Sequence, residues 1–66
     1  MTVTGIEERV RAIRERRHDA EEAHSLEGGL YADFIAFVAS GEDGPIREMA
    51  QAILKTQEIE FPRWCA

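Results

Sequence analysis

The residues whose types and spacing could bind a metal lie between positions 21 and 27. Glu21 and His24 are three positions apart, so on a helix both side chains project from one face, as in carboxylate-bridged di-iron bundles. Glu27 lies one helical turn further and could add a third ligand. Two copies across a dimer axis would then bind iron or zinc. The simpler interpretation, which we favour, is a buried or half-buried hydrogen-bonded pair of His24 and Glu27 between two helices, because the other glutamates of such a centre are not evident.

Nucleophilic catalysis finds little support in the sequence. Cys65 is the single cysteine and stands beside the last residue, where no scaffold would hold a base against it. Ser25 and Ser40 lack the strand–turn–helix context of a nucleophile elbow. The glycines match no phosphate-binding spacing. We therefore predict that the chain is not an enzyme, has no catalytic residue and needs no organic cofactor.

The charge is acidic and unevenly distributed. The chain has 66 residues and a net charge of −5. Residues 1–18 carry a small positive excess and residues 19–66 a large negative one, which argues against binding to a phosphate backbone. A chain of this length makes a marginal core alone, and one cysteine cannot form an internal disulfide. No signal peptide or membrane-spanning run is evident, so we expect a cytoplasmic protein that binds neither nucleic acid nor membrane.

Apolar spacing predicts helices and no strands. Thr4 and Glu7 have the capping-box arrangement that begins a helix, and a seam of alternating four- and three-residue intervals starts at Ile6. We expect helices over about residues 4–27 and 29–40. The glycine pair between them leaves the two helices either continuous or broken, because each glycine costs roughly 1 kcal/mol relative to alanine.

The last third of the chain predicts one more helix and a tail. Gly41 should end the preceding helix, and Pro45 suits the first position of a helix over about residues 45–58. The tail over residues 59–66 is rich in large apolar side chains although a chain end usually frays. We expect three of them to dock onto the helices, namely Ile59, Phe61 and Trp64.

A belt of large apolar residues covers about half of the circumference of the central helix, more than one partner helix normally covers. The belt comprises Leu26, Leu30, Tyr31, Phe34, Ile35, Phe37 and Val38. The shorter last helix cannot cover the apolar residues of the first, Ile6, Val10 and Ile13. Either the chain folds back at the glycine pair to make a three-helix bundle, or a second chain covers them. We favour a symmetric dimer that completes an antiparallel bundle.

Tryptophan and arginine in the tail are the residue types that dominate protein interfaces. We expect Phe61 and Trp64 to close the chain's own core, with a partner-binding peptide as the alternative. Arg63 should stack on Trp64 or pair with an acid such as Asp33 or Glu60.

Three stretches of the chain resemble small uncharacterised proteins of actinobacteria and their phages. They are residues 23–27 (Ala-His-Ser-Leu-Glu), residues 30–35 (Leu-Tyr-Ala-Asp-Phe-Ile) with the following turn at Gly41, and residues 56–66. The resemblance spans roughly residues 19–66 and implies a phage or actinobacterial origin and intracellular action. The chain departs from the pattern at Gly28 or Gly29, where an acidic residue is expected, which leaves the continuity of the central helix open.

The sequence thus predicts a single all-α domain of two or three antiparallel helices with a docked tail, completed by dimerisation. We expect an acidic, non-enzymatic protein-interaction module, acting on a host protein if it is phage-encoded. The alternatives are the di-iron-type dimer and a structural subunit of a larger assembly. The residues expected to form the core or the interface are Leu30, Tyr31, Phe34, Phe37, Val38, Phe61, Arg63 and Trp64.

Overall fold

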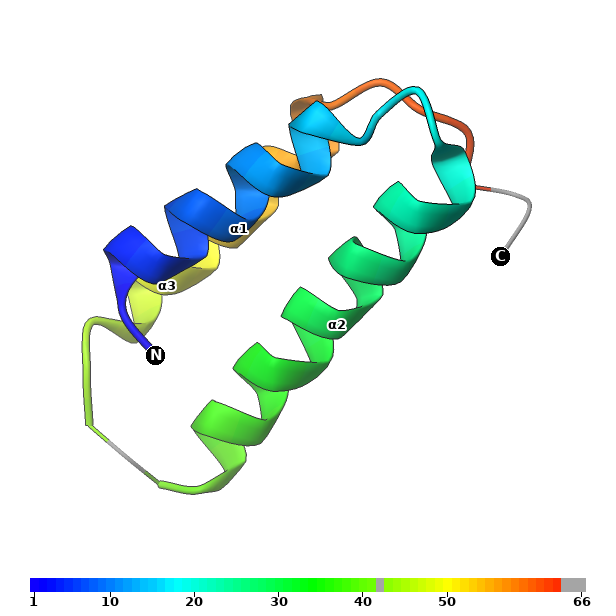
Figure 1. Ribbon diagram of the computed structural model, residues 1–66. Helices are drawn as coiled ribbons and strands as arrows, with labels where there is room; N and C mark the ends of the chain where they lie inside the picture. The colour runs from blue at the N-terminus through cyan, green and yellow to red at the C-terminus, as the bar shows by residue number, and fades with distance from the viewer. Residues whose placement is uncertain (42, 64–66) are drawn as a thin grey trace.

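Three α-helices pack together in the computed structural model, which describes residues 1–41 and 43–63 (Figure 1). The helices are α1 (Val3–Glu15), α2 (Ala20–Ala39) and α3 (Ile46–Ile53), followed by the 3-10 helix η1 (Leu54–Glu58). α2 runs antiparallel to α1, and α3 lies behind α1 in the view of Figure 1. The predicted all-α fold is confirmed, and the described residues contain no strand. The predictions for Trp64 and Cys65 lie outside these residues.

α1 begins two residues earlier than predicted. Its N-cap is Thr2, whose Oγ1 accepts a hydrogen bond of 3.0 Å from the backbone N–H of Gly5. This contact satisfies one of the N–H groups that a helix start leaves without a partner. The predicted capping box of Thr4 and Glu7 is therefore wrong, because both residues already lie inside the helix.

The chain reverses at residues 16–19, not at the glycine pair. Asp19 caps α2 by accepting a hydrogen bond of 3.2 Å from the backbone N–H of Glu22. The Glu22 carboxylate in turn pairs with Arg16 at 3.0 Å across the turn. Negative side chains in a first helical turn favour a helix start at this position. The predicted single helix over residues 4–27 and the continuous seam are therefore wrong, whereas the predicted helix over residues 29–40 forms the C-terminal part of α2.

The glycine pair lies inside α2, which is continuous from Ala20 to Ala39. Gly41 then ends the segment with a φ of 77°, a backbone conformation that glycine adopts without strain. The last helix begins at Ile46 after Pro45, close to the prediction. The final five residues of the predicted range over 45–58 form the tighter 3-10 helix η1.

The core lies where α1 meets α2, α3 and the tail. Its buried side chains are Ile6, Val10, Ile13, Ala23, Leu30, Met49, Ile53 and Ile59. Because the chain reverses at residues 16–19, α3 covers the apolar residues of α1 within one chain. A second chain is not needed to bury them, so the reasoning that led from these residues to a dimer fails. In the described part of the chain, no helix combines the length and hydropathy needed to cross a bilayer.

Candidate functional site

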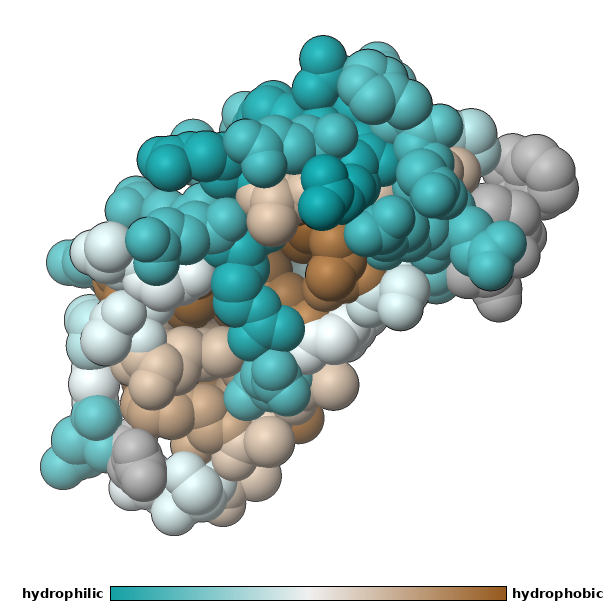
Figure 2. All heavy atoms as spheres, in the orientation of Figure 1, coloured by the Kyte–Doolittle hydropathy of each residue, from teal (hydrophilic) through white to brown (hydrophobic). Residues whose placement is uncertain are grey.

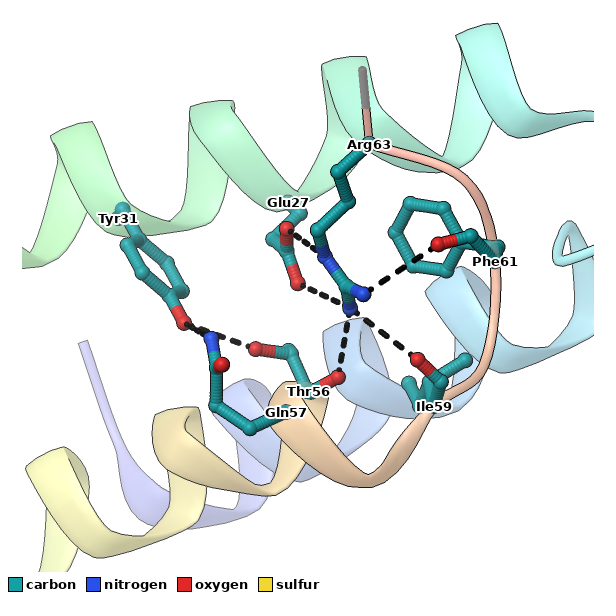
Figure 3. Close-up of polar contacts among 7 residues, drawn as sticks. All are labelled: Glu27, Tyr31, Thr56, Gln57, Ile59, Phe61 and Arg63. Atoms are coloured by element: carbon teal, nitrogen blue, oxygen red, sulfur yellow. Dashed lines mark hydrogen bonds and ion pairs between the residues drawn. The ribbon is translucent and has the colours of Figure 1, made fainter.

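A polar cluster centred on Glu27 fastens the tail to α2 (Figure 3). Arg63 contacts both carboxylate oxygens of Glu27, with Nε donating to Oε1 at 2.9 Å and Nη2 donating to Oε2 at 3.0 Å. Nη2 also contacts the carbonyl oxygens of Thr56 at 2.8 Å and Ile59 at 3.2 Å. These carbonyls lie at the end of η1, where a helix leaves acceptors without partners and where a cation is favourable. One guanidinium thus joins α2, η1 and the tail.

The tail docks as predicted, but Arg63 has different partners. Ile59 is buried and Phe61 packs against the core. The guanidinium carbon of Arg63 lies 3.9 Å from the centroid of the Phe61 ring, a cation–π arrangement that orients both side chains. The expected partner Asp33 instead pairs with Arg9 at 2.9 Å. Pairing of Arg63 with Asp33 is therefore wrong, and stacking on Trp64 lies outside the described residues.

A chain of hydrogen bonds extends the cluster along α2. The Gln57 side-chain amide donates to the Tyr31 hydroxyl at 3.0 Å, and that hydroxyl lies 2.9 Å from Thr56 Oγ1. Either of these two hydroxyls could be the donor. The hydrogen bonds thus join α2 to η1 at a second point, beside the pair of Glu27 and Arg63.

The cluster keeps Glu27 ionised. Burial by itself would raise the pKa of Glu27, but the hydrogen bonds from Arg63 and Thr56, with the charges of Arg63 and His24, bring that pKa below its ordinary value of 4.5. The hydrogen bond to Glu27 likewise raises the pKa of Arg63. The two groups are therefore oppositely charged throughout the physiological pH range. His24 contributes only as a nearby charge, while both carboxylate oxygens of Glu27 accept from Arg63. The predicted hydrogen-bonded pair of His24 and Glu27 is therefore wrong.

This arrangement pairs the polar groups of the cluster with one another. Within residues 1–41 and 43–63, no buried side-chain nitrogen or oxygen lacks a hydrogen-bond partner. In the same residues, no three acidic, histidine or cysteine side chains gather in a geometry that could hold a metal ion. Glu21 is exposed, and both oxygens of Glu27 contact Arg63. A single chain therefore does not assemble the predicted site of Glu21, His24 and Glu27.

The second feature is apolar and exposed. The side chains of Ile35, Val38 and Leu54 are 65%, 46% and 58% exposed, and the half-buried Tyr31 and Phe34 lie beside them. We call these five residues the apolar face. A groove of about 230 Å³ runs between α2 and α3 at this face, and its lining continues onto Ala50 and Ile53. The face is thus a concave apolar surface on two helices.

The belt predicted from the sequence is only partly covered. Leu30 is buried, Phe37 is half-buried, and Leu26 is 39% exposed on another side of α2. Figure 2 shows hydrophobic surface gathered over the C-terminal half of α2, whereas α1 and the start of α2 are largely hydrophilic. A helix that is apolar on most sides normally lies in a protein interior. The C-terminal half of α2 instead lies at the edge of this fold, because α3 is short and contacts mainly α1.

A second surface pocket lies between the start of α1 and the end of α2. Arg9 and Asp33 line it, together with Phe37 and Ser40. The two charged groups pair with each other at 2.9 Å. Because the pair already neutralises itself, the opening offers no single-signed site for a charged ligand.

These features rest on the chain's own residues, since no family model, curated protein or solved structure matches it. Sequence reasoning identified Glu27 and Arg63 separately but missed their pairing and the roles of Thr56 and Gln57. The two charges are 36 positions apart, so no helical spacing connects them. The only available signal was that Arg63 is the single basic residue among residues 59–66 and lies two positions after Phe61.

Proposed function

We propose that this chain is a non-enzymatic protein-interaction module that binds through the apolar face. The observation that carries the proposal is the exposure of Ile35 and Leu54, which line one groove, together with exposed Val38 on the same helix as Ile35. Water contact with large aliphatic side chains costs about 25 cal/mol per Å² of apolar surface. A protein surface that covers them recovers this free energy, and a contiguous exposed apolar patch is typical of interaction sites.

The electrostatics of the chain supports a protein partner over a nucleic acid. The net charge is −5, and five of the eight Lys and Arg residues lie on or next to α1. A phosphate backbone would meet an apolar surface at the groove and repulsion over most of the rest. If the chain is phage-encoded, as the resemblance implies, a host protein is the natural partner.

Site-specific photo-crosslinking tests the proposal. A benzophenone amino acid replaces Ile35 in the apolar face of one chain and Arg11, which is exposed on α1, in the matched control. Each labelled chain is irradiated in an actinobacterial lysate with and without an excess of unlabelled chain. We expect a discrete product at position 35, suppressed by the unlabelled chain and missing at position 11. The same diffuse labelling at both positions would refute a dedicated binding face.

A quantitative test follows for the protein identified in that product. Ile35→Lys places a charge in the middle of the apolar face while leaving the core untouched, because Ile35 is 65% exposed. We expect at least a tenfold loss of affinity, which corresponds to about 1.4 kcal/mol. Arg11→Lys is the control and should bind as the unmodified chain does. Equal affinity of Ile35→Lys would contradict the proposal.

A further inference from the structure

We infer that a groove between α1 and the segment of α3 and η1 binds an acidic peptide segment of a partner protein. This groove is separate from the groove of the apolar face, because the two share no lining residue. Its volume is about 370 Å³, within the range of roughly 300–1,000 Å³ for ligand pockets. We call it the basic groove, and its lining residues are Glu7, Val10, Arg11, Arg14, Ala52 and Lys55.

Three cations from two elements surround the basic groove. Arg11 and Arg14 are three positions apart on α1 and are exposed, so their side chains project from neighbouring points of one helix. Lys55 on η1 supplies the third cation from the opposite wall. Against these three charges the lining holds one carboxylate, that of Glu7. The basic groove therefore has an excess of two positive charges, although the net charge of the chain is −5.

These cations are available to a ligand. Within the described residues, neither Arg11 nor Arg14 pairs with a carboxylate, whereas the neighbouring arginines at positions 9 and 16 pair with acids of α2. Lys55 pairs with Glu58 at 3.7 Å, and these two side chains are 63% and 65% exposed. Because an exposed pair of this kind contributes little to stability, Lys55 can exchange Glu58 for the carboxylate of a ligand.

The floor of the basic groove is apolar. Val10 is buried and Ala52 is half-buried, so they lie below the charged groups. The aliphatic stems of the basic side chains extend this apolar surface, since arginine and lysine carry their charge at the end of a hydrocarbon chain. An aliphatic side chain of a ligand would bury apolar surface against this floor. The basic groove therefore fits a segment that places an aliphatic residue among carboxylates.

The lining favours a peptide over a nucleic acid. None of the described lining residues is aromatic, so a base would find no ring on which to stack. A nucleic acid has a phosphate at every step and would place one of them against Glu7. A peptide can place an uncharged residue at this point and its carboxylates beside the three cations.

Fluorescence anisotropy with labelled synthetic peptides tests the inference. The probe is a short peptide in which glutamates flank a pair of leucines, and the matched probe has glutamines in place of the glutamates. We expect the glutamate peptide to bind the unmodified chain and to lose affinity as salt screens the charges. The glutamine peptide should bind about tenfold more weakly or less. Equal binding of the two peptides, or no binding of the glutamate peptide at low salt, would overturn the inference.

Removal of single charges locates the binding. Arg14→Gln should weaken binding of the glutamate peptide about threefold to fivefold, the effect of losing one exposed ion pair. The matched control is Arg47→Gln, which removes the same charge from an exposed position of α3 outside the basic groove and should leave the affinity unchanged. Circular dichroism confirms that both variants are folded. Equal effects of the two substitutions would show attraction to charge in general and would overturn the groove.

A charge reversal tests direct contact. A chain with both Arg11→Glu and Arg14→Glu should no longer bind the glutamate peptide and should bind a peptide with lysines at the same positions. Backbone amide chemical shifts of the unmodified chain should change most over residues 7–14 and 52–55 when the glutamate peptide is added. Changes confined to other parts of the chain would place the peptide elsewhere and contradict the inference.

Other occupants of the basic groove give different results. An oligonucleotide that binds more tightly than the glutamate peptide at equal salt, and that Arg14→Gln weakens, would replace the acidic peptide by a nucleic acid. Self-association in sedimentation equilibrium that Arg14→Gln abolishes would instead assign the groove to the acidic first turn of α2, which contains Glu21 and Glu22, in a second copy of the chain.

The basic groove and the apolar face are tested separately. Ile35→Ser removes an apolar side chain from the apolar face without changing the charge, so the glutamate peptide should bind this variant as it binds the unmodified chain. A loss of peptide binding in Ile35→Ser, with Arg14→Gln unaffected, would assign the peptide to the apolar face and overturn the inference. The benzophenone at position 11 itself removes one cation of the basic groove, so the product captured from position 35 reports on the apolar face alone.

Discussion

Replacing Arg63 should destabilise the fold more than replacing any surface arginine. Arg63→Met keeps the length of the aliphatic stem and removes the charge-assisted bonds to Glu27 and to the carbonyls of Thr56 and Ile59. It also leaves a carboxylate that is 9% exposed without its cation. Hydrogen bonds to charged groups contribute about 1.5–3 kcal/mol each, and water can partly replace them because the Arg63 side chain is 32% exposed. We therefore expect a loss of about 2–4 kcal/mol.

This loss is a large fraction of the free energy of unfolding of the whole chain. At about 0.05–0.15 kcal/mol per residue, a chain of 66 residues has a free energy of unfolding of roughly 3–10 kcal/mol. A domain of this size loses about 4–8 °C in Tm for each kcal/mol, so Arg63→Met should lower the Tm by roughly 8–32 °C. Urea unfolding followed by circular dichroism at low protein concentration measures both quantities.

The matched control is Arg16→Met. Arg16 pairs with Glu22 at 3.0 Å, but both side chains are about half exposed. Exposed pairs contribute about 0–1 kcal/mol, so the control should change stability by less than about 1 kcal/mol. Equal losses of stability for the two variants would refute the reasoning, because the pair of Arg63 with the buried Glu27 would then stabilise the fold no more than an exposed pair does.

A double-mutant cycle isolates the pair itself. Glu27→Gln keeps the shape of the side chain and removes its charge. If Arg63 stabilises the fold through Glu27, then Glu27→Gln should cost much less in the Arg63→Met background than alone, with a coupling of about 1–3 kcal/mol. Additive losses would show that Arg63 acts through the carbonyls of Thr56 and Ile59 instead.

Three further predictions follow from the same contacts. The folded-state pKa of Glu27 is lowered, so its ionisation stabilises the fold above about pH 4.5. That contribution is lost as the pH falls through the lowered pKa. In an acid titration followed by circular dichroism, Glu27→Gln should therefore lose stability less steeply than the unmodified chain. Asp19→Ala removes the cap of α2 and should cost about 0.5–2 kcal/mol in urea unfolding, whereas Ser25→Ala in the exposed middle of α2 should cost nothing measurable. Leu30→Ala opens a cavity in the core and should lower the free energy of unfolding by about 2–5 kcal/mol. The control Leu26→Ala, at a partly exposed position, should lower it by less than about 1 kcal/mol. Similar losses for the two variants would contradict the burial of α2 described above.

The sequence predicted a helix or a turn correctly where the residues that specify it lie within a few positions of one another. The apolar intervals of α3, the stop at Gly41 and the helix start after Pro45 depend on interactions between residues a few positions apart. The docking of Ile59 and Phe61 was also predictable, since large apolar side chains in an exposed tail are unfavourable.

The position of the chain reversal was misjudged because two local signals compete. The glycine pair suggests a break, yet two glycines cost only about 2 kcal/mol inside a helix, and burial of Ala23, Glu27 and Leu30 on one side of α2 holds the helix together. Asp19 and Glu22 have the capping-box spacing and mark the start of α2. Attention to that spacing would have found the reversal from the sequence.

The sequence by itself determined the helical class, the acidic charge and the presence of more apolar side chains on α2 than one neighbour covers. Each follows from composition or from spacings within one helical turn. Only the tertiary structure decided that Arg63 contacts Glu27 and that Ile35 and Leu54 line one exposed groove. These contacts depend on the turn at residues 16–19 and on the length of α3, which set the distance between segments far apart in the chain. Spacing within a helix carries no information about that distance.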